Sequence, residues 1–273
     1  MLAKMRGPDE RVAPRSGIAL PELVVNAAAA LGVPLDSITA LTGATKSSWA
    51  CGDHILRTGT AQDLDREVLA MTAASSSVPV PEVLERAEFA DGECAALLLT
   101  RLPGRPALDT AHATLREARC VGEACGRLHS LLALVQPPNG MRRVAAFTHA
   151  ETESPSEDRL LHLDLHPLNV LVDAGGAISG VIDWANAAIG PLVLDRARTW
   201  SVLTLDPAAL VLRNEPRSAA LLEGWSSVAG WADLPATARA WACEYMLDDL
   251  AARYPAHRLE HVRAHLSLAR SGV

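Results

Sequence analysis

The residues best suited to chemistry in this chain are two carboxylates and an amide near its middle. Asp164 is followed five residues later by Asn169, and Asp183 comes 14 residues after that. Carboxylate and amide oxygens are hard ligands that suit Mg²⁺, particularly where phosphate groups complete its coordination shell. A further carboxylate beside such an ion can orient a hydroxyl group for attack on phosphorus. The three residues therefore indicate phosphoryl transfer, provided that the fold brings them together.

The segments around these residues predict a hairpin that would bring them together. Residues 170–172 and 178–182 are short apolar runs that predict strands, and residues 173–176 between them are typical of a turn. Pro167 indicates that the stretch before the first strand is a loop, because proline interrupts a strand ladder. The two open ends of a hairpin lie side by side, so the preceding loop would meet the carboxylate that follows the second strand.

The same segment resembles a known family. The sequence DLHPLNVLVD, followed by GVIDWANA, is similar to the catalytic core of protein kinase-like enzymes and, within them, to the aminoglycoside phosphotransferase branch. The resemblance implies that Asp164 acts on the acceptor hydroxyl, that Asn169 and Asp183 bind Mg²⁺, and that ATP or GTP donates the phosphoryl group. It also implies supporting roles for His162 and Asp195.

Two features leave alternatives open. Leu163 stands where most members of the resembled branch carry glycine, which is compatible with a catalytically silent, nucleotide-binding protein of the same shape. Separately, His162, Asp164 and His166 alternate along the chain, and alternating side chains on a strand could bind zinc in a hydrolase. A zinc site, however, would leave the amide and the second carboxylate of the motif without a role.

The first hundred residues predict a small antiparallel sheet. A helix is expected at residues 20–31, and short strands are expected at residues 37–41, 48–51 and 54–57. The turn at residues 42–45 contains Gly43, and in the resembled family a glycine-containing turn at this place covers the nucleotide phosphates with backbone N–H groups. A single glycine is also compatible with an ordinary hairpin.

Arg57 and Glu67 form a second candidate pair. Arg57 ends the third predicted strand, and Glu67 follows ten residues later on a helix expected at residues 63–74. Kinase-like enzymes pair a strand cation with a helix glutamate at this separation, and the cation contacts the α- and β-phosphates. The context Ile55-Leu56-Arg57 is similar to that of an arginine in the resembled branch. The alternative is a pair of unrelated surface residues.

A further strand pair leads into the expected hinge. Residues 83–89 and 95–100 predict strands, and the second is apolar enough to lie inside the sheet. In the resembled family the next residues form the hinge between two lobes, so the Thr100 carbonyl and the Leu102 N–H are expected to contact the adenine edge. An ordinary loop after a buried strand is the alternative. The expected division is a nucleotide-covering lobe at residues 1–101, whose first 18 residues lack periodicity, and a catalytic and acceptor-binding lobe at residues 102–273.

Beyond the hinge the chain is predicted to be mostly helical. Helices are expected at residues 115–135, 218–229 and 237–253, with another opening at Asp195. In the resembled fold the last helices form one wall of the acceptor pocket, where carboxylates can bind ammonium groups. Glu244, Asp248 and Asp249 lie there, although a solvated helix face explains them more simply.

Composition argues against several other classes of protein. The chain has 273 residues and a formal charge of −7, which disfavours nucleic acid as a partner and mildly favours a cationic one. No apolar run approaches the roughly 18 residues of a membrane span, and the charged N-terminus lacks a signal core. We therefore expect no membrane partner and a cytoplasmic location. The five cysteines form no CxxC pair and predict free thiols.

These observations predict an α+β, two-lobed, protein kinase-like fold with a small antiparallel N-terminal sheet and a mostly helical C-terminal lobe. The expected activity is O-phosphorylation of a small molecule with Mg²⁺ and ATP or GTP. An aminoglycoside or other antibiotic is the expected acceptor, which would make the protein a resistance enzyme. A metabolite such as homoserine, choline or another amino alcohol is the alternative acceptor. No motif encodes the acceptor or the oligomeric state.

Overall fold

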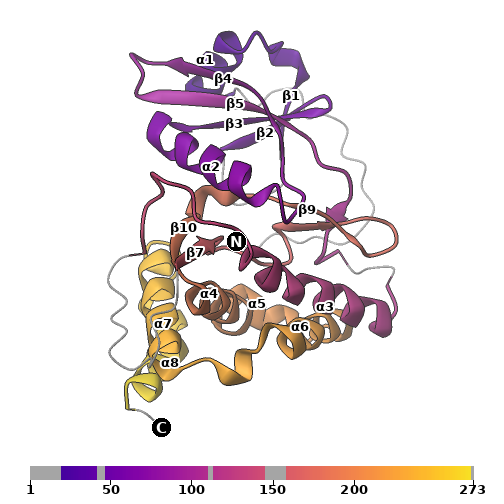
Figure 1. Ribbon diagram of the computed structural model, residues 1–273, viewed down its shortest axis with the longest axis vertical. Helices are drawn as coiled ribbons and strands as arrows, with labels where there is room; N and C mark the ends of the chain where they lie inside the picture. Colours follow the sequence, from indigo (N-terminus) through magenta and orange to yellow (C-terminus); the bar gives the residue numbers. More distant parts are fainter. Residues whose placement is uncertain (1–19, 42–46, 110–112, 145–157, 272–273) are drawn as a thin grey trace. The chain divides into compact units, whose positions relative to one another are not determined.

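The computed structural model (Figure 1) describes residues 20–41, 47–109, 113–144 and 158–271 of the chain. The chain divides into two compact units. The first is formed by the chain up to Val68 together with Pro81–Arg101, and the second by Leu69–Val80 together with the chain from Leu102 onward. Residues 69–80 therefore belong to the second unit, although they come before the boundary at residue 101 that was expected from the sequence.

The first unit is built on a five-stranded antiparallel sheet with the strand order β1-β2-β3-β5-β4. The strands are β1 (Ile38–Ala40), β2 (Ser48–Cys51), β3 (His54–Thr60), β4 (Val83–Phe89) and β5 (Cys94–Thr100). β5 is paired on both sides, in agreement with its continuous apolar sequence. β3 does not end at Arg57 as expected, because its ladder with β5 continues as far as the pair Thr60 and Cys94.

Helix α1 (Glu22–Ala30) covers part of this sheet. It begins after Pro21, whose fixed backbone suits the start of a helix. Its buried residues Val24 and Ala27 share one apolar core with Leu56 of β3 and Ala96 of β5. The small alanines let the helix lie close to the sheet, so burial of this core holds β3 and β5 in place. Helix α2 (Ala61–Ala74) follows β3 directly and carries Glu67.

The second unit contains two small sheets around the predicted hairpin. β6 (Arg105–Pro106), β8 (Val170–Val172) and β9 (Ile178–Val181) form one sheet, and β7 (Asp158–Leu161) and β10 (Ala188–Pro191) form the other. The hairpin is present as β8–β9. Its turn is held by Asp173, whose Oδ1 accepts the N–H groups of Gly175 and Ala177 at 2.8 and 2.9 Å. The β7–β10 pair was not expected, because the glycine and proline of β10 are typical of a turn.

The rest of the second unit is helical. Its helices are α3 (Leu115–Leu132), α4 (Leu192–Leu205), α5 (Pro207–Leu212), α6 (Pro216–Ala229), α7 (Ala236–Leu250) and α8 (Glu260–Ser271). α4 begins three residues before Asp195, where the helix was expected to open, because Pro191 occupies its N-cap. α6 likewise begins at Pro216, and its N-cap Glu215 accepts the Ser218 N–H. No helix in the described ranges is long and apolar enough to cross a bilayer.

Helices α3 and α6 lie side by side (Figure 1) and approach each other through glycine. A Cβ atom on Gly122 of α3 would overlap the carbonyl oxygen of Leu221 of α6, and a Cβ atom on Gly224 of α6 would overlap that of Arg119. On Gly126 a Cβ atom would lie 2.8 Å from the Trp225 carbonyl oxygen. The two backbones are therefore too close for any side chain at these places.

Candidate active site

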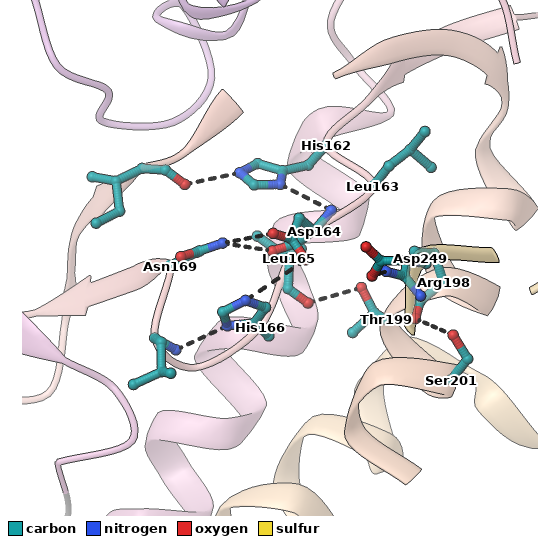
Figure 2. A network of polar contacts seen from close by, with 12 residues as sticks. His162, Leu163, Asp164, Leu165, His166, Asn169, Arg198, Thr199, Ser201 and Asp249 are labelled. Atoms are coloured by element: carbon teal, nitrogen blue, oxygen red, sulfur yellow. Dashed lines mark hydrogen bonds and ion pairs between the residues drawn. The ribbon is translucent and has the colours of Figure 1, made fainter. Parts of the chain in front are cut away.

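The loop between β7 and β8 carries the first two residues of the predicted site. Asn169 donates from Nδ2 to the Asp164 carbonyl oxygen at 2.9 Å and lies 3.4 Å from Asp164 Oδ2 (Figure 2). Because Nδ2 is engaged in this way, Oδ1 is the Asn169 atom left to coordinate a cation. The Asp164 side chain is 21% exposed, whereas Asn169 is buried. The Asp164 side chain thus reaches solvent, while Asn169 fixes the loop conformation by its hydrogen bond to the Asp164 backbone.

Backbone contacts bring Asp183 to the same loop. Val170 of β8 pairs with Val181 of β9, and the Ile182 N–H donates to the Asn169 carbonyl oxygen at 2.9 Å. Asp183 follows at once and adopts a left-handed backbone with φ 63° and ψ 68°. The structure therefore gathers Asp164, Asn169 and Asp183 on adjoining segments, as the hairpin predicted.

Trp184 fixes the turn that carries Asp183. It begins the short helix η2 (Trp184–Asn186), is buried, and donates from Nε1 to the Val181 carbonyl oxygen at 3.0 Å. Its ring also packs on the His162 ring, with the ring centroids 4.6 Å apart. Burial of this tryptophan sets the direction in which the chain leaves β9 and so orients the neighbouring carboxylate.

The donor set of the site fits Mg²⁺. Asn169 and Asp183 offer only oxygen donors, which this hard cation prefers. Among the described residues, no group of three or more histidine, cysteine, aspartate or glutamate side chains is arranged to hold a metal ion. The alternative zinc site at His162, Asp164 and His166 is therefore not formed. In agreement, His166 Nδ1 accepts the Leu168 N–H at 3.3 Å, and its Nε2 lies 3.7 Å from Asp164 Oδ1.

His162 is a fully buried, neutral imidazole. Its Nδ1 accepts the Asp164 N–H at 3.3 Å, and its Nε2 donates to the Ile182 carbonyl oxygen at 3.1 Å (Figure 2). Only the neutral ring, protonated on Nε2, can make both contacts. Burial lowers the pKa of His162 below its ordinary value, although Asp195, Asp164 and Asp183 oppose this shift. The His162 ring therefore joins the loop that carries Asp164 to the end of β9, which precedes Asp183.

Asp195 of α4 fixes the start of the same loop through hydrogen bonds. Its Oδ1 accepts the backbone N–H groups of His162 and Leu163 at 2.9 and 2.8 Å, and its Oδ2 lies 2.9 Å from His129 Nδ1 of α3. Burial opposes the charged form, but the bonds from His129 and the Leu163 N–H lower the pKa of Asp195 below its ordinary value. His129 is a partnered core histidine, and Asp195 makes the contacts expected of a supporting residue.

Leu163 occupies a position that suits glycine. Its φ of 59° lies in the left-handed region, which costs a residue with a Cβ roughly 1–2 kcal/mol. The Leu163 side chain is only 2% exposed, and burial of a leucine stabilises a fold by about 1.5–3 kcal/mol. Burial therefore offsets the strain, and the loop keeps its hydrogen bonds to Asp195 although the glycine typical of the resembled branch is replaced.

Arg57 and Glu67 form a buried ion pair in the first unit. Arg57 Nε on β3 lies 3.1 Å from Glu67 Oε2 on α2, and the two side chains are 7% and 5% exposed. Arg57 Nη1 also donates to the hydroxyl groups of Ser47 and Ser48 at 2.7 and 3.0 Å. The alternative of two unrelated surface residues is thus wrong. That Arg57 contacts nucleotide phosphates remains a prediction.

The other predicted nucleotide contacts are less defined. Thr100 ends β5, its N–H donates to the Glu82 carbonyl oxygen at 2.9 Å, and its hydroxyl accepts the Glu82 N–H at 2.8 Å. Leu102 follows the strand and is half-buried. Gly43 lies outside the described residues. The contacts of all three with a nucleotide remain predictions.

The carboxylates expected to bind the acceptor lie on α7, and two of them are already paired. Asp249 contacts Arg198 and Arg253, each at 2.8 Å, and Glu244 contacts Arg270 at 2.6 Å. Asp248 is exposed. A carboxylate bound by arginine attracts an ammonium group less strongly, so these residues suit a cationic acceptor poorly as they stand.

Sequence reasoning missed two residues that lie beside the loop. Thr199 of α4 donates from its hydroxyl to the Leu165 carbonyl oxygen at 3.0 Å, and Arg198 precedes it (Figure 2). Their only sequence signal is spacing, since they follow Asp195 by three and four residues and so lie on the same face of the helix.

Comparisons with known proteins agree with this geometry. A model of the phosphotransferase enzyme family matches residues 49–159 and 140–231. None of the curated proteins matches the chain.

Several solved structures share the fold. The GDP complex of wild-type aminoglycoside 2'-phosphotransferase-IIIa is 15% identical, with 91% of this chain and 97% of that chain covered and a TM-score of 0.58. The GDP and kanamycin complex of APH(2")-IIia is 15% identical, with 91% and 98% covered and a TM-score of 0.59. A thermostable mutant of aminoglycoside phosphotransferase APH(4)-Ia with ADP and hygromycin B is 19% identical, with 86% and 94% covered and a TM-score of 0.51. These likenesses confirm the kinase-like fold predicted from the sequence.

Proposed function

Since the chain belongs to the phosphotransferase enzyme family, we propose that it transfers the terminal phosphoryl group of ATP or GTP to a hydroxyl group of a small molecule, with Mg²⁺. The observation that carries this proposal is the gathering of Asp164, Asn169 and Asp183 on adjoining segments held by backbone hydrogen bonds. This set supplies one carboxylate for the hydroxyl group and two oxygen donors for the cation, which is what phosphoryl transfer requires.

These residues divide two roles in the proposed reaction. Asp164 accepts the proton of the acceptor hydroxyl and orients its oxygen toward phosphorus. Asn169 and Asp183 hold Mg²⁺, which neutralises the charge on the phosphates. His162 and Asp195 touch neither substrate but fix the loop of Asp164 through its backbone. Catalysis in this scheme is mostly positioning and electrostatic stabilisation.

Part of the donor site is proposed to lie within residues 57–102. Arg57 is the phosphate-binding cation, oriented by Glu67, and Thr100 and Leu102 are the backbone contacts to the base. Structural relatives have been solved as complexes with GDP and with ADP, which supports a nucleotide donor without distinguishing ATP from GTP. Because the guanidinium of Arg57 is already held by Glu67, little side-chain ordering is left for the moment of binding.

The first acceptors to test are aminoglycosides. Structural relatives have been solved as complexes with kanamycin and with hygromycin B, and phosphorylation of such a compound would make the protein a cytoplasmic resistance enzyme. A second candidate is a hydroxyl-bearing metabolite such as homoserine. The observation that favours this candidate is the pairing of Glu244 and Asp249 with arginines, which leaves less free negative charge for a polycation.

A nucleotide-consumption screen tests the proposed function. Purified protein, Mg²⁺ and ATP or GTP are mixed with aminoglycosides, neutral alcohols, amino alcohols and hydroxy acids, and phosphorylated products are identified by mass spectrometry. Acceptor-dependent transfer is expected with at least one class, and it should be at least about 100-fold slower in Asp164→Asn. Nucleotide binding without transfer to any acceptor would instead identify a catalytically silent protein.

The proposed cation ligands are tested by a Mg²⁺ titration of the same activity. Asp183→Asn replaces a carboxylate with a neutral amide, so half-maximal activity should need at least about tenfold more Mg²⁺. Asn169→Ala should shift the titration in the same direction but less far. If the Asp183→Asn and parent titrations superimpose, Asp183 does not bind the cation.

A further inference from the structure

Arg198 of α4 is a buried arginine with unused hydrogen-bond donors. The residue is 2% exposed, its Nη2 donates to Asp249 Oδ2 at 2.8 Å, and its Cζ lies 4.6 Å from the centroid of the Tyr245 ring. Nε and Nη1 are buried and have no hydrogen-bond partner among the described residues. Leaving a buried donor unpaired destabilises the fold, and the cost is larger for a charged group. A group that supplies oxygen atoms to Arg198 would remove this cost.

The charges around Arg198 favour an anion as that group. Asp249 is shared, because its Oδ1 also contacts Arg253 at 2.8 Å, so two guanidinium groups face one carboxylate. Glu244 is bound to Arg270 and is not available to balance them. From residue 195 to residue 271 the chain carries nine arginines and nine acidic residues, so this region has no acidic surplus despite the net charge of −7. The arginine pair around Asp249 therefore has a local excess of positive charge.

The residue after Arg198 is bonded to the loop between β7 and β8 that carries Asp164. The next residue, Thr199, donates to the carbonyl oxygen of Leu165, which is itself the residue after Asp164. Figure 2 shows Arg198, Asp249 and Thr199 beside the loop that carries Asp164. Any hydroxyl group that Asp164 orients must belong to a molecule lying next to this loop. An acceptor that extends from Asp164 along this loop toward α4 would therefore approach Arg198 and Asp249.

We propose that Arg198 is a specificity-determining residue that binds an anionic oxygen group of the acceptor, of which a carboxylate is the simplest. The inference rests on the proposed phosphotransferase function and narrows its substrate class to hydroxyl compounds that also carry an anionic group. Arginine suits this role because it remains charged at all accessible pH values and offers several donors in fixed directions. Asp249 and the Tyr245 ring hold the guanidinium in position for the incoming group.

Matched acceptors test the proposal. 4-Hydroxybutanoate, 4-hydroxybutanamide and 4-aminobutan-1-ol share a four-carbon skeleton and a hydroxyl group but carry a negative, a neutral and a positive end. Longer matched sets are built in the same way on any acceptor found in the screen. The carboxylate member should have the highest kcat/KM of each set. Arg198→Met should lower that value by about 10- to 100-fold, mainly through KM, the loss typical of a charged hydrogen bond. Turnover of the neutral member should change by less than about threefold.

Two further variants separate binding by Arg198 from a merely structural effect. Arg253→Met removes the more exposed of the two arginines that contact Asp249, and it should weaken the preference for the carboxylate member much less than Arg198→Met does. Asp249→Asn increases the positive excess, so it should raise kcat/KM for the carboxylate member and lower it for the ammonium member. Arg198→Lys keeps the charge and should retain part of the preference even where Arg198→Met is unstable.

A binding measurement makes the inference independent of turnover. The three compounds are titrated without nucleotide into ¹⁵N-labelled protein while the arginine Nε–H resonances are recorded. The Arg198 signal, assigned from its loss in Arg198→Lys, should shift with 4-hydroxybutanoate and not with the amide or the amine. Equal or stronger effects of the ammonium compounds, in binding or in kcat/KM, would overturn the proposal while leaving the phosphotransferase function intact. Loss of transfer with every acceptor, together with a shifted Arg198 signal, would count against the proposed function alone.

Discussion

Single residues in the loop between β7 and β8 are held mainly by their backbone. The N–H groups of His162 and Leu163 point to Asp195, and the N–H group of Asp164 points to the His162 ring. Among the residues that the structure describes, the Asp164 carboxylate itself has a long contact with Asn169 Nδ2 and another with His166. Substitution of this side chain should therefore change the chemistry far more than the fold.

Asp164→Asn tests this directly. Asparagine keeps the shape of the side chain but cannot accept a proton, so kcat should fall by roughly 10²–10⁴ with little change in nucleotide affinity. The measurement is kcat from product formation together with nucleotide affinity from calorimetry. Asp233→Asn makes the same chemical change at an exposed position and should keep parental kcat. A near-parental kcat in Asp164→Asn would remove Asp164 from the mechanism.

His162 predicts a pH dependence of stability. Because folding lowers the pKa of His162, the unfolded chain takes up a proton more readily below roughly pH 6.5, the ordinary value for histidine. The stability contributed by the neutral ring is therefore complete above that pH and is lost as the pH falls below it. Tm should drop between pH 7.5 and pH 5, and the drop should be smaller in His162→Gln. His257→Gln, at an exposed position, is the control, and parallel pH profiles of parent and His162→Gln would contradict the assignment.

At the scale of secondary-structure elements, the ion pair between β3 and α2 predicts coupled effects. If Arg57 contacts the phosphates and Glu67 orients it, Arg57→Ala should lower kcat/KM for the nucleotide by about 10- to 100-fold. Glu67→Ala should lower it by less, and the double variant should be little worse than Arg57→Ala, because Glu67 then has nothing to orient. The measurement is kcat/KM for the nucleotide in all four proteins of the cycle.

A second ion pair on α2 provides the matched control for this cycle. Arg66 and Asp63 lie 2.8 Å apart on the exposed side of the helix, and a pair of this kind contributes at most about 1 kcal/mol. Arg66→Ala and Asp63→Ala should leave kcat/KM for the nucleotide unchanged. Additive losses of kcat/KM in the Arg57 and Glu67 cycle would mean that the two residues act separately. An unchanged kcat/KM together with a lowered Tm would mean that the buried pair stabilises the fold without contacting the nucleotide.

The contact between α3 and α6 predicts a strong effect of a small substitution. Gly122→Ala places a methyl group against the backbone of α6, which cannot retreat as a flexible side chain would. We expect a loss of about 3 kcal/mol or more and therefore a fall in Tm of at least roughly 6 °C. Gly175→Ala, in the exposed β8–β9 turn, should change Tm by less than about 2 °C. Similar Tm values for both variants would show that the two helices separate without cost.

At the scale of the whole molecule, local patterns were enough to predict the elements that position the site. The apolar runs on either side of Asp173 predicted the β8–β9 hairpin. The hairpin in turn predicted that Asp164, Asn169 and Asp183 lie on adjoining segments. The helix carrying Glu67 and the strand carrying Arg57 were also predictable, because both have regular periodicity and are close in sequence. Each of these features depends on residues at most about 20 positions apart.

Features that depend on distant segments were not predictable in the same way. β10 could not be recognised, because its glycine and proline are typical of a turn. Its pairing with β7 leaves no local pattern in the sequence. The contact between Arg198 and Asp249 joins residues 51 positions apart, so the sequence showed three acidic residues on a helix and not their arginine partners. The left-handed conformation of Leu163 likewise depends on its buried surroundings, which no local pattern reveals.

The buried Asp195 carboxylate has a thermodynamic consequence for substrate binding. It joins α3, α4 and the loop between β7 and β8 through bonds from His129, His162 and Leu163, all of which lie within the protein. The conformational entropy of this loop is therefore given up when the chain folds. Ligands bind to a loop that is already ordered, so their binding free energy contains no cost for ordering this loop. Weakening these bonds, as in Asp195→Asn, should make the entropy of ligand binding more unfavourable even where the bound contacts are unchanged.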